Sequence, residues 1–376
     1  MYSDPLAKPA GARATILPTW MLKAVEAVRA WAGWRWIGYA LSAAIISVSV
    51  IVLWHVLADL QIDGVVEALR RTPPHKIVAA AIFVAAAFVT LTFYEFFGLR
   101  TIGIAHVPYR IAALASFTGY SIGHNIGAPA ITGGAVRYRV YSPWGLRVLD
   151  IAKLCFITGL TFWLGNTTVL SLGMILEPGA VTAVDHLPAA MNRILGLVAL
   201  GVLVVYVLWA WRRQRKIGRN SWTVNLPSGP LTFLQIGIGI LDLVCTAYAM
   251  YLLMPERPYI DFMTLAVIFA SATLLGFASH APGSMGVFDA AMLLALSQYE
   301  KEQLVAALVL FRLLYFVIPF TLALTALGLR EIYMSFINGR AVKGEVARLL
   351  TVDPGAPGAE PEVKKASRKI KEPTDA

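Results

Sequence analysis

Two short segments of this 376-residue chain combine glycine, proline, histidine and a charged residue inside otherwise apolar surroundings. They cover residues 121–137 and 279–289, and in each a charge stands three residues after the last glycine. A helix that begins after such a glycine points free N–H groups and a positive dipole end at an anion. Because phosphate is the obvious anion of a membrane, the pattern predicts a site for a phosphate-bearing ligand.

The residues expected to contact this ligand lie in the two segments and in the apolar runs around them. They are His124, Asn125, Gly133, Gly134, Arg137, Arg139, Asp289, Arg312, Tyr315 and Glu95. Arg312 and Tyr315 are three residues apart and share one face of a predicted helix. Structural alternatives stay open: an ion pair between Arg312 and Asp242, histidines satisfied in the core, and glycines that only allow close helix packing.

The elements that must position these residues are membrane helices. Of all residues, 58% are hydrophobic and 14% are charged, whereas soluble domains carry about 25% charged residues. A hydrocarbon core about 30 Å thick needs about 20 apolar residues. Runs of suitable length occupy 37–58, 77–98, 151–176, 194–211, 231–253, 260–280 and 304–327. The sequence therefore predicts an all-α polytopic membrane helix bundle.

Two further apolar segments are broken or short, at 111–134 and 284–298. We expect 111–134 to be re-entrant and 284–298 to cross, which gives about eight crossings. Irregular backbone inside a membrane is tolerated only where protein or a watery cavity surrounds it. Gly/Pro-interrupted segments at corresponding positions of two halves are typical of transporters with an inverted repeat. An inverted repeat is therefore one reading of the two motifs, and chance similarity is the other.

The basic residues predict the orientation, because Lys and Arg concentrate on the cytoplasmic side. With 111–134 re-entrant, 24 of the 32 basic residues fall on one side, which we take as cytoplasmic for both termini. The expected organisation is a cytoplasmic segment 1–36, a transmembrane domain 37–329 and a basic, partly disordered tail 330–376. The net charge of +10 is explained by this bias and by anionic lipid, so no nucleic-acid partner is expected.

Enzyme motifs are missing from the sequence. It contains no Walker loop, no His-Glu-x-x-His, no paired Asp-x-Asp and no cysteine cluster, and Cys155 and Cys245 both sit in apolar runs. We therefore expect no catalytic residue, no metal and no cofactor.

The string Gly-His-Asn-Ile-Gly-Ala-Pro-Ala-Ile-Thr-Gly-Gly-Ala-Val-Arg-Tyr-Arg-Val-Tyr-Ser-Pro-Trp-Gly-Leu at 123–146 resembles a known signature. It is similar to that of the lysylphosphatidylglycerol synthase transmembrane-region family, the flippase-like domain of the multiple peptide resistance factors. Weaker matches follow the family's order at 93–100, 161–165, 282–289 and 312–319. Glu95 stands where the family has Asp, and Asp289 where it has Glu, so both charges are kept.

The resemblance implies a protein of the bacterial inner membrane that moves a lipid between leaflets. In the best-understood members the lipid is an aminoacylated phosphatidylglycerol, and a cytosolic synthase domain charges it. This chain shows no such domain, so no aminoacyl transfer is expected. The alternatives are an integral-membrane lipid or polyprenyl-phosphate transferase using His124, Asp289 and Glu95, and a non-transporting scaffold of an envelope enzyme. The expected partners are a lipid phosphate head group, with a homo-oligomer or an envelope enzyme as further options.

Overall fold

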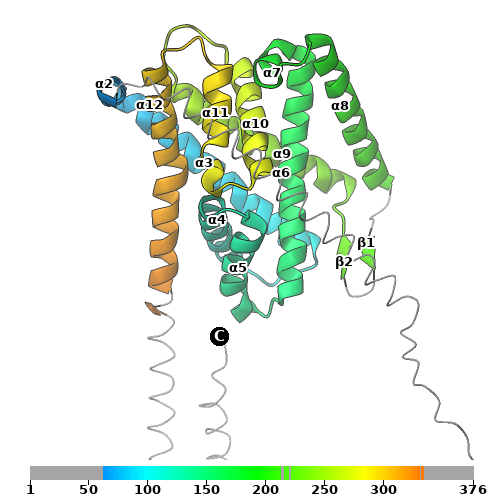
Figure 1. Ribbon diagram of the computed structural model, residues 1–376. Helices are drawn as coiled ribbons and strands as arrows, with labels where there is room; N and C mark the ends of the chain where they lie inside the picture. Colours follow the sequence, from blue (N-terminus) through cyan, green and yellow to red (C-terminus); the bar gives the residue numbers. More distant parts are fainter. Residues whose placement is uncertain (1–61, 213–215, 220–221, 331, 334–376) are drawn as a thin grey trace, which may run out of the picture.

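The computed structural model describes residues 62–212, 216–219, 222–330 and 332–333, which form a bundle of helices (Figure 1). Six of the described helices are long and apolar enough to cross a membrane: α3 (Pro74–Thr101), α6 (Val148–Leu176), α8 (Ala189–Arg212), α9 (Gly229–Leu253), α10 (Phe262–Ser279) and the helix Lys301–Arg330 that begins with α12 (Lys301–Arg312). The predicted all-α polytopic membrane bundle is thereby confirmed. The predicted span 37–58, the segment 1–36 and most of 330–376 lie outside the described residues.

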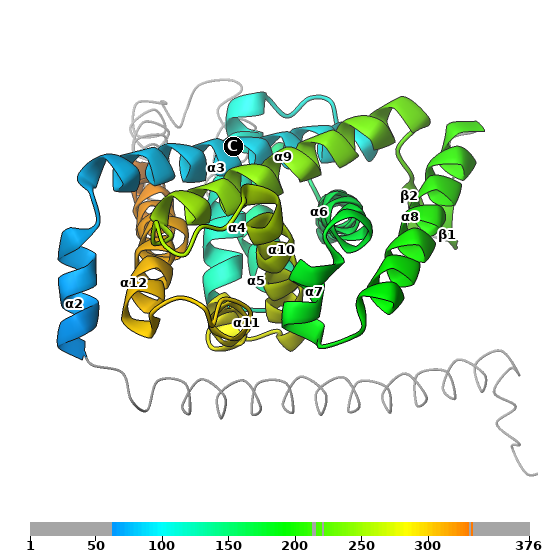
Figure 2. The same cartoon turned by 90° about the horizontal axis from the view of Figure 1, so that it is seen from above.

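Shorter elements connect these helices. They are α2 (Ile62–Arg71), the 3₁₀ turn Ser142–Trp144, α7 (Pro178–Asp185) and the antiparallel strands β1 (Lys216–Arg219) and β2 (Trp222–Asn225). Figure 2 shows α3 and α9 running side by side along one edge of the bundle. Small residues let the long helices approach closely: a Cβ placed on Gly165 of α6 would lie 2.5 Å from the Cα of Gly239 on α9. The backbones of α6 and α9 are therefore in direct contact at these two glycines.

The predicted re-entrant segment is a hairpin of two helices, α4 (Tyr109–Ile126) and α5 (Pro129–Tyr141). The chain reverses at Gly127 and Ala128, whose φ angles of 90° and 46° lie in the left-handed region. The arms are antiparallel, because Gly119 lies against Arg137 and Gly123 against Gly133. The broken, returning helix predicted at 111–134 is thus present, and its second arm extends further than expected and carries Arg137.

A second hairpin joins α10 to α11 (Val287–Ala295) through a 3₁₀ turn at Pro282–Ser284. The nine residues of α11 extend about 14 Å, roughly half of the hydrocarbon thickness. The prediction that 284–298 crosses the membrane by itself is therefore wrong. Instead α11 folds back on α10, so that Phe288 packs edge-to-face on Phe269, with ring centroids 5.4 Å apart.

The two hairpins meet at their tips in the middle of the bundle. A Cβ on Gly127 would lie 3.3 Å from the Cα of Pro282 and 3.4 Å from the carbonyl oxygen of His280. In Figure 1 the α10–α11 hairpin occupies the upper half of the bundle and the α4–α5 hairpin the lower half. The two motifs that the sequence singled out are therefore brought into contact, in the arrangement an inverted repeat would give. Equivalence of the two halves stays a prediction.

Candidate functional site

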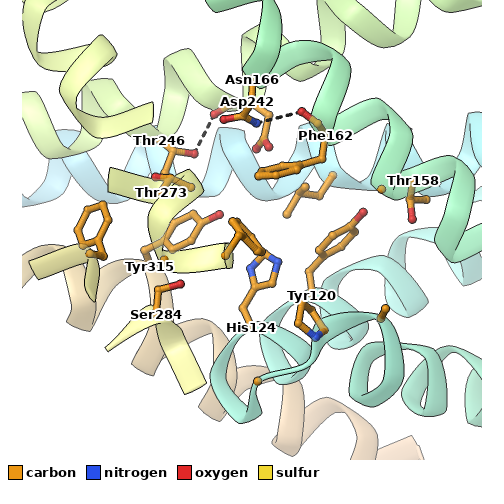
Figure 3. Close-up of a pocket in the computed structure, with 18 of the residues that line it drawn as sticks. Tyr120, His124, Thr158, Phe162, Asn166, Asp242, Thr246, Thr273, Ser284 and Tyr315 are labelled. Carbon is orange, nitrogen blue, oxygen red and sulfur yellow. Dashed lines mark hydrogen bonds between the residues drawn. The ribbon is translucent and has the colours of Figure 1, made fainter. Parts of the chain in front are cut away.

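A cavity of about 280 Å³ lies where the hairpin tips face α6 and α9. Nine of its 29 lining residues are Phe, Tyr or Trp, as expected of a ligand pocket in which a few polar groups fix the orientation. Figure 3 shows His124 and Tyr120 of α4 facing Asp242 of α9 and Asn166 of α6 across this space. Its remaining polar lining comes from Arg137, Thr158, Thr246, Thr273, His280, Ser284 and Tyr315.

Arg137 forms a buried ion pair with Glu95 of α3. Its Nε donates to both carboxylate oxygens, at 2.9 and 3.0 Å, and the Tyr141 hydroxyl donates to Oε1 at 3.1 Å. The Arg137 side chain is 4% exposed and that of Glu95 is fully buried. A charge so deep is retained only when it is paired and hydrogen-bonded. The pair therefore fixes the α4–α5 hairpin to α3.

The guanidinium of Arg137 also has a side that faces the cavity. It lies over the Tyr120 ring, 4.6 Å from the centroid, and it lines the pocket. Among the described residues, no hydrogen-bond acceptor meets its buried Nη2 nitrogen. A buried donor without an acceptor costs about 1–3 kcal/mol, and more when it is charged. An anionic oxygen that enters the cavity would supply the missing acceptor.

Arg312 and Asp289 form the corresponding ion pair of the second hairpin. Nε of Arg312 donates to Oδ1 at 2.8 Å and Nη2 to Oδ2 at 2.5 Å, while Nη1 donates to the carbonyl of Gly283 at 3.1 Å. Asp289 also accepts the backbone N–H of Gly286 at 3.0 Å, at the start of α11. Arg312 thus ties the tip to the helix Lys301–Arg330, and the alternative pair between Arg312 and Asp242 is wrong.

Each hairpin is therefore held by an ion pair to a long helix, and the positions of the basic and the acidic residue are exchanged between the two hairpins. In α4–α5 the hairpin carries the arginine and a long helix carries the acid; in α10–α11 the hairpin carries the acid. Each hairpin charge is the one three residues after the last glycine of its motif. These charges were predicted to face a ligand, and the structure places both in ion pairs. Of the four partners only Arg137 lines the cavity.

Asp242 lies near the middle of α9 and faces the cavity. The Thr90 hydroxyl donates to its Oδ1 at 3.1 Å, and the Tyr94 hydroxyl donates to Oδ2 at 3.2 Å. The residue is 7% exposed, and no Lys, Arg or His of the described chain is close enough to pair with it. An ionisable residue inside a membrane domain is by default a candidate functional group.

His124 and Tyr315 line the cavity as well. The His124 ring contacts Tyr120 and Phe277 edge-to-face, each with centroids 5.5 Å apart. Tyr315 stacks on Phe311 and lies in a π-helical turn, Leu313–Val317, just before Pro319. Such turns are frequent at functional sites. Three of the ten predicted contact residues, His124, Arg137 and Tyr315, therefore reach the cavity.

The other predicted residues lie outside it. Asn125 donates to the carbonyls of Ser121 and Phe316, at 2.7 and 3.2 Å, and so joins the α4 tip to the π-helical turn. Gly133 permits close packing, because a Cβ there would lie 2.8 Å from the Gly119 carbonyl oxygen. Gly134 faces Cys155, and Arg139 lies on the exposed face of α5.

Several lining residues are not among the predicted contacts, chiefly Tyr120, Phe162, Asn166 and Asp242. A signal existed for two of them. Asp242 is an acid inside the predicted span 231–253, where the sequence suggests an ion pair and gives no sign of a cavity. Phe162 lies within the family-like string 161–165, which was used for the resemblance alone.

The chain is similar in sequence to several known membrane proteins. A family model described as "Lysylphosphatidylglycerol synthase TM region" matches residues 35–323. The inner membrane protein YbhN of Escherichia coli is 31% identical over 229 residues, which cover 59% of this chain and 70% of YbhN. An uncharacterized protein of Synechocystis sp. is 26% identical over 246 residues, covering 65% of this chain and 76% of the relative.

A relative with a named activity is matched over a smaller share of its length. The phosphatidylglycerol lysyltransferase of Staphylococcus haemolyticus is 26% identical over 292 residues, 75% of this chain but 33% of the lysyltransferase. The similarity therefore concerns one third of that protein.

Proposed function

Because the chain belongs to the lysylphosphatidylglycerol synthase TM region family, we propose that it moves a phospholipid or a related lipid between the leaflets of the bacterial cytoplasmic membrane. The observation that carries this proposal is the cavity between the hairpin tips, where Arg137 offers a buried N–H group without an acceptor. A lipid phosphate has the charge and the oxygen atoms to meet that group.

In the proposed mechanism only the head group enters the cavity. Its phosphate binds at Arg137, which Glu95 holds in place, while the acyl chains stay in the surrounding lipid. Small shifts of one hairpin tip relative to the other would open the cavity toward one leaflet at a time. Arg312 and Asp289 act indirectly here, by holding the α10–α11 tip.

The orientation forms part of the proposal. Both termini are cytoplasmic, the α4–α5 hairpin enters from the cytoplasmic side, and the α10–α11 hairpin enters from the opposite side. Basic residues near the ends of α4–α5, such as Arg100, Arg110 and Arg147, support this choice. We propose no chemical step for the chain and therefore no aminoacyl transfer.

Lipid translocation in reconstituted liposomes tests this function. Head-group-labelled phospholipids are quenched from outside, and the protected fraction is followed with and without protein. We expect protein-dependent loss of protection that Arg137→Ala abolishes, because the phosphate loses its cationic partner. Arg147→Ala, which removes an exposed arginine, is the matched control and should keep the wild-type rate. Unchanged translocation by a correctly inserted Arg137→Ala variant would refute the site.

A further inference from the structure

Three carboxylates lie in the described helices around the cavity, two of them buried and that of Asp289 half-buried, and they differ in their partners. Glu95 has Arg137 and Asp289 has Arg312, in both cases with two hydrogen bonds from the guanidinium. Asp242 has only the neutral hydroxyls of Thr90 and Tyr94. The fold therefore neutralises two of the acids permanently and leaves the third without a counter-charge.

We propose that Asp242 is a proton-binding site that couples lipid movement to the proton gradient. The inference rests on the lipid transport proposed above and adds its energy source. Asp242 would take a proton from water on one side of the membrane and release it on the other, without any other reactant. Asp242 lines the cavity, so water that enters this space would reach its carboxylate.

The surroundings of Asp242 favour a proton over a permanent ion pair. A carboxylate desolvated without a cation is costly, and protonation is the usual way in which a protein removes such a charge. Asn166 lies beside Asp242 on the cavity wall (Figure 3). It directly follows Gly165, which contacts Gly239 where α6 meets α9. The Oδ1 atom of Asn166 is a buried acceptor without a partner among the described residues. A proton on Asp242 would add a donor next to this acceptor.

The position of Asp242 also sets the direction of coupling. Arg137 and Asp242 line the same small cavity, so a phosphate bound at Arg137 would place its negative charge near the carboxylate. Like charges in a low-dielectric site raise each other's affinity for protons. Phosphate and proton should therefore bind together and leave together, which makes the expected transport a symport of lipid and proton.

Other titratable groups face Asp242 and must be separated from it in any test. They are Tyr94 on α3, Tyr120 and His124 on α4, Tyr315 in the π-helical turn, Cys245 on α9 itself, and Arg137 across the cavity. Tyrosine and arginine are not expected to titrate near neutral pH, so His124 is the main competitor. The variants Asp242→Asn and His124→Gln separate the two.

The first experiment measures the distribution of a labelled phospholipid between leaflets. Wild-type liposomes carry a pH gradient, with the membrane potential held at zero by potassium and valinomycin. One proton per lipid predicts a shift of about tenfold in the leaflet ratio per pH unit. Asp242→Asn should remove the shift, and the exposed-site control Glu256→Gln should retain it. His124→Gln removes a residue of the cavity wall and can slow translocation, but the leaflet ratio that it reaches should still respond to the pH gradient. A wild-type protein that translocates lipid without any gradient response overturns the proposal, and so does a response lost in His124→Gln alone.

The second experiment does not depend on transport. Infrared difference spectroscopy of the purified protein in lipid detects the C=O stretch of a protonated carboxyl group. A band that is lost on raising the pH and is missing in Asp242→Asn supports the proton site. It does so even if the chosen phospholipids do not move, because absence of lipid movement would count against the proposed function only. If wild-type protein has no such band, the inference is wrong whatever the transport assay gives.

Discussion

The buried pair of Arg137 and Glu95 makes a quantitative prediction about stability. We consider Arg137→Met, which keeps most of the side-chain length but removes the charge. The carboxylate of Glu95, which has no exposed surface, would lose both guanidinium hydrogen bonds and keep only that from Tyr141. Removing one partner of a buried ion pair costs about 3–5 kcal/mol, because the remaining charge stays desolvated.

The double variant Arg137→Met with Glu95→Gln should regain much of this loss. Its buried glutamine is neutral and still able to accept the Tyr141 hydroxyl hydrogen. We therefore expect a coupling free energy of about 0.5–3 kcal/mol between the two positions, the range measured for residues that share a network. Transport should stay absent in the double variant, because the phosphate ligand is not restored.

The assay is unfolding in mixed micelles with increasing fractions of a denaturing detergent, followed by circular dichroism. All four proteins of the cycle are measured under the same conditions. Additive effects of the two single substitutions, with a coupling below about 0.5 kcal/mol, would refute the argument. Recovery of both stability and transport in the double variant would show that Arg137 acts only as a structural partner.

Three further predictions concern the hairpins. Gly133→Ala should destabilise the protein by about 1–3 kcal/mol in the same unfolding assay, because its Cβ meets backbone, whereas Gly134→Ala, with the nearest atom 3.6 Å away, should be tolerated. Asp289→Asn should cost about 1.5–3 kcal/mol and speed hydrogen exchange at the α10–α11 tip, because Arg312 loses its charged acceptor; unchanged exchange would contradict the tie. Cysteines at Ser142 and at the 81% exposed Tyr259 should react with impermeant thiol reagents from opposite sides, and labelling from one side would overturn the topology.

Much of the fold could be predicted from the sequence because apolar length is a local property. The long helices α3, α6, α8 and α9 each follow a run that was recognised from composition alone. Segment 284–298 was misread because hydropathy does not show whether a short apolar helix continues across the membrane or folds back. That outcome depends on the turn at Pro282–Ser284 and on the packing of Phe288 against Phe269, neither of which composition reveals.

The site was less predictable, because pairing depends on which helices become neighbours. The unusual charges are evident from the sequence, but their partners are not. Glu95 and Arg137 are 42 residues apart, and Asp289 and Arg312 are 23 residues apart. For Asp242 the sequence likewise does not show which groups surround it. Its mid-span position was evident, whereas its isolation from any described cation and its place on the cavity wall depend on the folded arrangement.

The exchanged ion pairs have a consequence for the response to membrane voltage. One elementary charge that crosses 100 mV changes the energy by about 2.3 kcal/mol, so a lone arginine on a moving hairpin would act as a voltage sensor. Because Arg137 and Asp289 are each matched by a charge on a long helix, each of the two ion pairs is electrically neutral. An ion pair whose two members shift together transfers no net charge. The membrane potential would then act on the transported head group and on Asp242, and not on the two ion pairs.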